Sequence, residues 1–149
     1  MSEAPIPSIE AVIDTQVVMD WLVFRDPRSA PLARAIETGS LCWIGRPRML
    51  DELLHVLGRG VAADWSPDLA FIRDSFARHC RMIDAEPAPA VRLVCRDKDD
   101  QMFIDLAIAE KARWLISRDR AVLALAKRAR VVGLEILTPE SWLKTSQPS

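Results

Sequence analysis

Short runs of consecutive apolar residues alternate along this chain with segments whose apolar residues recur at helical spacing. The continuous runs are typical of strands that are buried on both faces of a parallel sheet. Such strands are expected at residues 10–15, 41–45, 81–85, 114–117 and 134–138.

Between the strands, the spacing of apolar residues and the signals of helix ends predict helices. They are expected at residues 16–24, 29–39, 46–59, 66–80, 100–112, 120–129 and 139–143. Ser29 and Ser66 are expected to cap the second and fourth of these helices. Strand and helix therefore alternate throughout, which predicts an α/β fold with a parallel sheet covered on both faces.

The composition is that of one globular domain. The chain has 149 residues, of which 50% are hydrophobic and 28% are charged, so it can form a sizeable core and does not resemble a disordered segment. We expect a single domain over residues 1–149, with its core at about 10–143. The net charge of −1 gives no global basic signature, so binding to nucleic acid would need a local patch.

Cysteine usage and the apolar segments indicate where the protein resides. Cys42, Cys80 and Cys95 are widely spaced and odd in number, which predicts separate thiols in a reducing compartment rather than disulfides or a zinc site. The first ten residues lack the basic and apolar regions of a secretory signal, and no apolar stretch approaches the ~20 residues of a membrane span. We therefore expect a cytoplasmic protein with no membrane partner.

Acidic residues gather where predicted strands end and predicted helices begin. Asp14 ends the first strand, Asp119 follows a later strand, and Asp99 and Asp100 open the helix that comes between them in the chain. The carboxyl ends of parallel strands share one edge of the sheet, and ligands bind beyond that edge. Acids from distant parts of the chain are therefore expected to converge.

Helix geometry adds a further acid to this group. Glu52 lies on the margin of the apolar stripe of its helix, so it is expected to reach inward over the sheet edge, whereas Asp51 faces solvent. Asp105 lies about 140° round its helix from Asp100 and is expected to face away from the site.

Two explanations compete for the acids at residues 97–100 and at Asp119. Each can be a helix cap, worth about 1 kcal/mol, but capping needs one acid per helix and residues 97–100 offer three. Two carboxylates about 4 Å apart repel by about 4 kcal/mol at an effective dielectric of ~20, so a cluster takes up either a proton or a cation. Ligands that are all carboxylate oxygens suit Mg²⁺ or Mn²⁺ rather than zinc.

Four stretches carry a resemblance to a known family: VIDTQVV, MLDELLHVL, CRDKDDQMFIDLAIAEKARWLISRDRAVL and EILTPESWL. In order and spacing they resemble the PIN-domain family, and most closely its bacterial branch of toxin components of toxin–antitoxin systems. The resemblance implies a PIN-like three-layer α/β/α sandwich with a central, mainly parallel sheet of four to five strands. It also implies an endoribonuclease that depends on Mg²⁺ or Mn²⁺.

The resemblance assigns roles to particular residues. Carried over by position, the family's metal-binding and catalytic acids fall on Asp14, Glu52, Asp100 and Asp119. Asp99 is then an auxiliary ligand or a cap, and Asp97 another recurrent acid of this branch. Ser117 supplies the hydroxyl of the turn before the last acid, while Gln16 stands where the family usually has Asn.

The implied partners are RNA, a cognate antitoxin and a second copy of the chain. Gln16 keeps an alternative open, because its amide is displaced by one methylene from that of Asn: a PIN-fold module, catalytically weak or silent, that binds RNA or a protein partner. Phosphotransfer on an aspartate is a third interpretation. It is disfavoured because the first strand reads D-T-Q, without a second Asp, and no Gly-rich phosphate loop is present.

Basic side chains near the same edge offer candidate contacts to RNA phosphates. The candidates are Arg25, Arg46, Arg48, Arg118 and Arg120. Trp43 and Trp114 fall in predicted strands and are expected in the core rather than stacked on bases. His55 and His79 have no metal-ligand spacing and are not expected to be catalytic.

Overall fold

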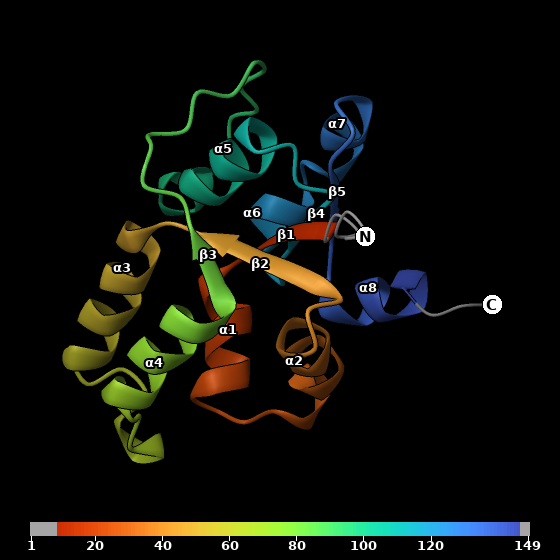
Figure 1. The fold of residues 1–149 in the computed structure, drawn as a ribbon. Helices are drawn as coiled ribbons and strands as arrows, with labels where there is room; N and C mark the ends of the chain where they lie inside the picture. Colours follow the sequence, from red (N-terminus) through yellow and green to blue (C-terminus); the bar gives the residue numbers. More distant parts are fainter. Residues whose placement is uncertain (1–8, 147–149) are drawn as a thin grey trace, which may run out of the picture.

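The computed structural model describes residues 9–146, which form a five-stranded sheet between two layers of helices (Figure 1). The strands are β1 (Ile9–Ile13), β2 (Leu41–Gly45), β3 (Cys80–Met82), β4 (Trp114–Ile116) and β5 (Glu135–Leu137). Every neighbouring pair is parallel, in the order β3-β2-β1-β4-β5. The predicted α/β/α sandwich is confirmed. The predicted core lies within the described residues, and the outer ends of the predicted 1–149 domain lie outside them.

The helices follow the predicted pattern with one exception. They are α1 (Thr15–Leu22), α2 (Ala30–Glu37), α3 (Pro47–Gly58), α4 (Leu69–His79), α5 (Gln101–Ala109), α6 (Arg120–Leu123), α7 (Ala126–Val131) and α8 (Pro139–Ser146). The single helix predicted at 120–129 is wrong. It divides into α6 and α7 because the chain tightens at buried Leu125, whose N–H donates to the carbonyl of Val122, three positions back. No helix in the described range is long and apolar enough to cross a membrane.

Ser29 stands at the N-cap position of α2 as predicted, but its side chain makes no capping hydrogen bond, and the predicted cap at Ser66 is wrong. Nearby aspartates accept the hydrogen bonds instead. The N–H of Arg28 donates to Asp26 Oδ1 at 2.9 Å, which begins the 3₁₀ turn η1 (Pro27–Ser29) that leads into α2. Ser66 has a left-handed backbone (φ 46°), and α4 starts later, where Asp68 accepts from the N–H of Phe71 at 3.0 Å. A carboxylate is favoured at these places because its charge also complements the helix dipole.

The sheet separates two hydrophobic cores, because successive side chains along a strand point to opposite faces. Ala11 and Ile13 of β1 pack with α1, α2, α3, α4 and α8 on one face, and Trp43 and Trp114 lie in that core as predicted. Val12 packs on the other face with α5, α6 and α7. Figure 1 shows these two helical layers on opposite sides of the sheet.

The strand order makes β1 and β4 the point at which the winding of the sheet reverses. From β1 the chain moves outward to β2 and β3, then returns to place β4 on the other side of β1 and continues to β5. Loops leave neighbouring strands in opposite directions at such a point, and the crevice beyond the carboxyl ends of these strands is where open α/β sheets bind ligands. Asp14 follows β1, and Ser117 follows β4, at this crevice.

Gly45, at the end of β2, leaves room for the side chain of Cys80 at the start of β3, since a Cβ atom there would lie 2.9 Å from the Sγ atom of Cys80. Gly45→Ala is therefore expected to lower the free energy of unfolding by about 1–3 kcal/mol, the usual cost of overpacking a core. Cys80→Ala removes the obstructing sulfur, so the double variant should be more stable than the sum of the two single losses implies. Urea denaturation measures this, and strictly additive losses would rule out the contact as the cause.

Candidate metal centre

Asp14 leaves β1 at the crevice and begins α1. Its Oδ1 accepts a hydrogen bond from the N–H of Gln16 at 2.8 Å, and its Oδ2 accepts one from Ser117 Oγ at 2.5 Å. The residue is only 3% exposed. Burial raises the pKa of Asp14, and the hydrogen bonds from Ser117 and Gln16 oppose this rise. Asp14 is therefore a buried carboxylate whose orientation is set from two sides.

The turn after β4 presents a second acid to the same place. Ser117 Oγ accepts from the N–H of Asp119 at 3.0 Å while it donates to Asp14, so one hydroxyl connects the two acids. Asp119 Oδ1 accepts from the N–H of Ala121 at 2.8 Å and caps α6. Capping and membership of the acidic group are therefore compatible roles for Asp119.

Three carboxylates come together at this point. Asp97, Asp100 and Asp119 each place one oxygen within 4.8 Å of the others; we call them the acid trio. Oδ2 of Asp100 is buried and has no hydrogen-bond partner in the described part of the chain. The pKa of Asp100 is raised to about 7, first by burial and then by the carboxylates of Asp119, Asp14 and Asp97.

The acid trio has the chemistry of a divalent cation site. A buried carboxylate oxygen without a partner, among other carboxylates, is stabilised by a proton or by a bound cation. The available donors are all carboxylate oxygens, which fits a hard cation such as Mg²⁺ or Mn²⁺. The residues present therefore fit a metal ion at the carboxyl ends of β1 and β4.

Asp97 contributes an oxygen to the acid trio, whereas Asp99 is not a member of it. Asp97 is the N-cap of the 3₁₀ turn η3 (Lys98–Asp100) and accepts the N–H of Asp99 at 3.0 Å. The role of Asp99 as an auxiliary ligand stays a prediction. Asp99 is exposed and lines a neighbouring pocket.

Glu52 lies on α3 and is not a member of the acid trio. Its side chain is 44% exposed, with Oε1 3.8 Å from Nε of Arg48 on the same helix. Asp51 is exposed, as the helical stripe predicts. The role of Glu52 as a metal ligand, directly or through water, stays a prediction.

Gln16 directs its amide away from the acid trio. Its Nε2 donates to Asp20 Oδ1 at 3.1 Å, one helical turn later in α1. Nε of Arg118 donates to the other oxygen of Asp20 at 3.1 Å, and Nη1 of Arg118 donates to both oxygens of Glu140 at 2.7 and 2.9 Å. Asp20 is 8% exposed, and sequence reasoning missed it. The feature that could have indicated it is a single acidic residue among the apolar residues of the predicted helix at 16–24.

Two of the five arginines predicted to bind RNA are occupied by partners within the protein. Arg118 is bound by Asp20 and Glu140, as described above. Arg46 is 14% exposed in its side chain, and its guanidinium donates to two backbone carbonyls in the loop after β3 and to Glu86 at 2.9 Å. Long-range partners within the protein therefore hold both guanidinium groups, although the buried Nη2 of Arg118 has no hydrogen-bond partner among the described residues. Contact of Arg46 and Arg118 with RNA stays a prediction.

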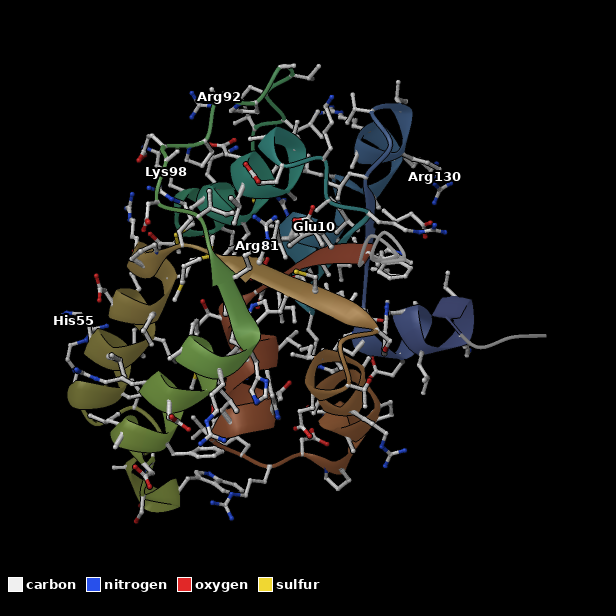
Figure 2. The ribbon with its side chains drawn as sticks, viewed as in Figure 1. Glu10, His55, Arg81, Arg92, Lys98 and Arg130 are labelled. Carbon is white, nitrogen blue, oxygen red and sulfur yellow. The ribbon has the colours of Figure 1, made fainter. Side chains whose placement is uncertain are left out.

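Arg25 is also misplaced, because it follows the far end of α1. Eight helical residues separate it from Asp14, about 12 Å along the helix axis. Arg48 and Arg120 are exposed near the correct edge. Lys98 (Figure 2) was not among the predicted residues. It lines, with Arg48 and Asp99, a pocket of about 200 Å³.

The two histidines lie away from the site, as predicted. His55 is exposed on the outer side of α3 (Figure 2). His79 ends α4, where its ring centroid lies 6.4 Å from that of Trp21. In the part of the chain that the structure describes, the acidic group therefore contains no imidazole ligand.

Comparison with known proteins agrees with this geometry. Residues 10–121 match the family model described as PIN domain. The match runs from β1 to the start of α6, so it contains the acid trio, Asp14 and Ser117. A search of the curated proteins gave no match.

The stability of the metal-free protein should depend on the charge state of Asp100. Its pKa is about 7 in the folded protein, against 3.8 for an unperturbed group, so the folded state holds this proton more tightly than the unfolded state. The resulting stability is complete at pH values below 3.8 and is lost as the pH rises towards 7, with Asp14 contributing in the same direction.

In EDTA, the unfolding free energy of the unsubstituted protein should therefore decrease over that pH range. The Asp100→Asn variant should show a much smaller decrease. Urea denaturation at a series of pH values measures it. Asp99→Asn is the matched control, because Asp99 lies outside the acid trio. An Asp100→Asn profile that is parallel to the unsubstituted one would contradict the assignment.

Proposed function

Because the chain belongs to the PIN-domain family, whose members are generally metal-dependent nucleases, we propose that it is an endoribonuclease dependent on Mg²⁺ or Mn²⁺. The observation that carries this proposal is the buried, unpartnered Oδ2 of Asp100 beside the carboxylates of Asp97 and Asp119. Such an oxygen serves no purpose in packing, and it is the donor that a cation requires.

The proposed metal ligands are Asp14, Asp97, Asp100 and Asp119, with Glu52 contributing from α3 directly or through water. A divalent cation held by these oxygens would lower the pKa of a water molecule and would neutralise charge on the phosphodiester. The protein contributes by holding the carboxylate oxygens in position before the cation binds. Asp14 is held by Ser117 and Gln16, and Asp119 is held by Ala121, so little side-chain freedom remains to be lost.

The substrate is proposed to be single-stranded RNA lying across the carboxyl edge of the sheet. Arg48, Lys98 and Arg120 are exposed around the acid trio, and each can contact a phosphate while the cation takes the scissile one. Because the net charge is −1, the protein as a whole does not attract a polyanion such as RNA, so binding depends on these basic side chains near the acid trio.

We further propose a biological role as the toxin of a type II toxin–antitoxin pair, acting in the cytoplasm. The support for this role is the resemblance of the sequence blocks described above to that bacterial branch. The proposed partners are a cognate antitoxin and a second copy of the chain.

One observation favours a second candidate, a PIN-fold module that binds RNA or a protein partner without cutting. Gln16 uses its amide on Asp20 rather than on the acids, so the pocket lacks the side-chain amide that the family usually places there. The two candidates differ in turnover, and the next experiment separates them.

Purified protein should cleave single-stranded RNA in Mn²⁺ or Mg²⁺, and EDTA should abolish the cleavage. Asp14→Asn and Asp119→Asn should each reduce kcat by at least about a hundredfold, because each removes a charge from the cation's ligands. Asp74→Asn, at an exposed acid paired with Arg78 on α4, is the matched control and should cleave normally.

Three results would count against the nuclease proposal. Equal cleavage by all variants, or cleavage in EDTA, would point to a contaminating enzyme. RNA binding without turnover would support the silent module. Mn²⁺ should also raise the melting temperature of the unsubstituted protein and of Asp74→Asn more than that of Asp119→Asn.

Arg48→Ala and Lys98→Ala should weaken RNA binding with little change in kcat or in Mn²⁺ binding. Each variant should also lower the slope of log K against log salt by about 0.7, the value for one phosphate contact with a single strand. Fluorescence anisotropy with labelled RNA measures both quantities. Arg130→Ala is the control, because Arg130 lies on α7, away from Lys98 (Figure 2). If Arg130→Ala weakens RNA binding as much as the other two variants, the basic residues act only through the overall charge of the protein and not through local phosphate contacts.

A further inference from the structure

We infer that Asp20 is a positioning residue, which keeps the two halves of the metal centre in place through Gln16 and Arg118. The inference rests on the proposed metal centre, but it concerns a residue outside the acid trio and outside the motif of the family resemblance.

The metal centre is built from two halves that belong to distant parts of the chain. One half is the start of α1, where Asp14 accepts from the N–H of Gln16. The other half is the turn after β4, which carries Ser117 and Asp119. The direct side-chain link between them is the hydrogen bond from Ser117 Oγ to Asp14 Oδ2.

Asp20 supplies a second link, and each of its carboxylate oxygens serves one half. Oδ1 accepts from Nε2 of Gln16, which belongs to the half that orients Asp14. Oδ2 accepts from Nε of Arg118, which stands between Ser117 and Asp119 in the turn. Both bonds are 3.1 Å long and part-buried, with Asp20 8% exposed and Gln16 at the surface.

The centre needs this restraint because its acids repel each other. Asp97, Asp100 and Asp119 each place an oxygen within 4.8 Å of the others, and like charges at such distances repel. Without a cation, the repulsion favours movement of the turn away from α1. The ion pair of Asp20 with Arg118 draws the turn towards α1 and so opposes the movement. Glu140 holds the exposed side of the same guanidinium from α8.

Stabilisation of the fold is a weaker explanation of Asp20. Replacing a buried ion pair by apolar residues is often neutral or even stabilising, because two charges no longer need to lose their water. Asp20 is surrounded in α1 by apolar residues that pack without this requirement. Unlike an apolar residue, Asp20 accepts hydrogen bonds that fix the orientation of the Gln16 and Arg118 side chains.

The experiment measures Mn²⁺ affinity without RNA, by the electron paramagnetic resonance signal of free Mn²⁺, at a temperature well below each melting midpoint. The variants are Asp20→Asn, Arg118→Gln and the double variant, with Asp74→Asn as the matched acid on α4. Asp20→Asn should weaken Mn²⁺ binding about tenfold, at the lower end of the range for residues that orient metal ligands. The double variant should be no weaker than the worse single variant, because both substitutions break one link.

The outcomes separate this inference from the proposed function. If the unsubstituted protein and Asp20→Asn bind Mn²⁺ equally well, Asp20 is a structural residue and the inference fails, while the metal centre stands. Fully additive losses would also overturn it, since Asp20 and Arg118 would then act separately. If the unsubstituted protein binds no Mn²⁺, the metal centre itself is overturned, and this inference with it. A lower melting temperature with unchanged affinity counts as the structural outcome.

Discussion

The hydrogen bond from Ser117 Oγ to Asp14 Oδ2 is the interaction on which the site depends. It joins the ends of β4 and β1, the two strands at which the winding of the sheet reverses. The same hydroxyl accepts the N–H of Asp119, so a single side chain connects a buried acid of the first strand to an acid that caps α6. Because the oxygen atoms are 2.5 Å apart, the Asp14 carboxylate has little freedom to turn away from its neighbours.

Around this bond the protein gathers negative charge where it has removed water. The fold tolerates the charge in three ways: Asp14 and Asp119 accept hydrogen bonds from helix starts, Asp20 is paired with Arg118, and Asp100 retains a proton up to about pH 7. A divalent cation bound at the proposed site would neutralise the same carboxylate in place of that proton. Metal binding would then release a proton, and the affinity for the metal would increase as the pH rises.

Much of this arrangement could be predicted from the sequence, because it follows from short-range patterns. Continuous apolar runs such as 10–15 indicated strands buried on both faces, and parallel strands bring their carboxyl ends to one edge. That was enough to predict that Asp14, Asp100 and Asp119 would converge, and the structure does bring them together. The division between α6 and α7 was not predictable, because both pieces fit one helical period and only the turn at Leu125 separates them.

Two details of the site depend on local backbone geometry and on distant partners, which residue spacing does not reveal. Asp97 and Asp99 are both close to Asp100 in the sequence, but only the backbone of the turn before α5 decides that Asp97 contributes an oxygen to the acid trio. Arg118 turns inward because Asp20, 98 positions earlier in the chain, is there to receive it. From the sequence alone, an arginine next to a site motif is naturally interpreted as a phosphate contact, because its partner within the protein is not visible.

The separation of 103 positions between Ser117 and Asp14 also determines when the site can exist during synthesis. β4 lies beside β1 in the sheet, although β2 and β3 are made between them. A growing chain can form α1 and pair β1, β2 and β3 while it still holds only Asp14 of the linked pair. Closing a loop of that length comes late in folding, since its entropy must be overcome before its contacts form. The proposed metal centre can therefore form only after the turn that carries Ser117 and Asp119 has been made.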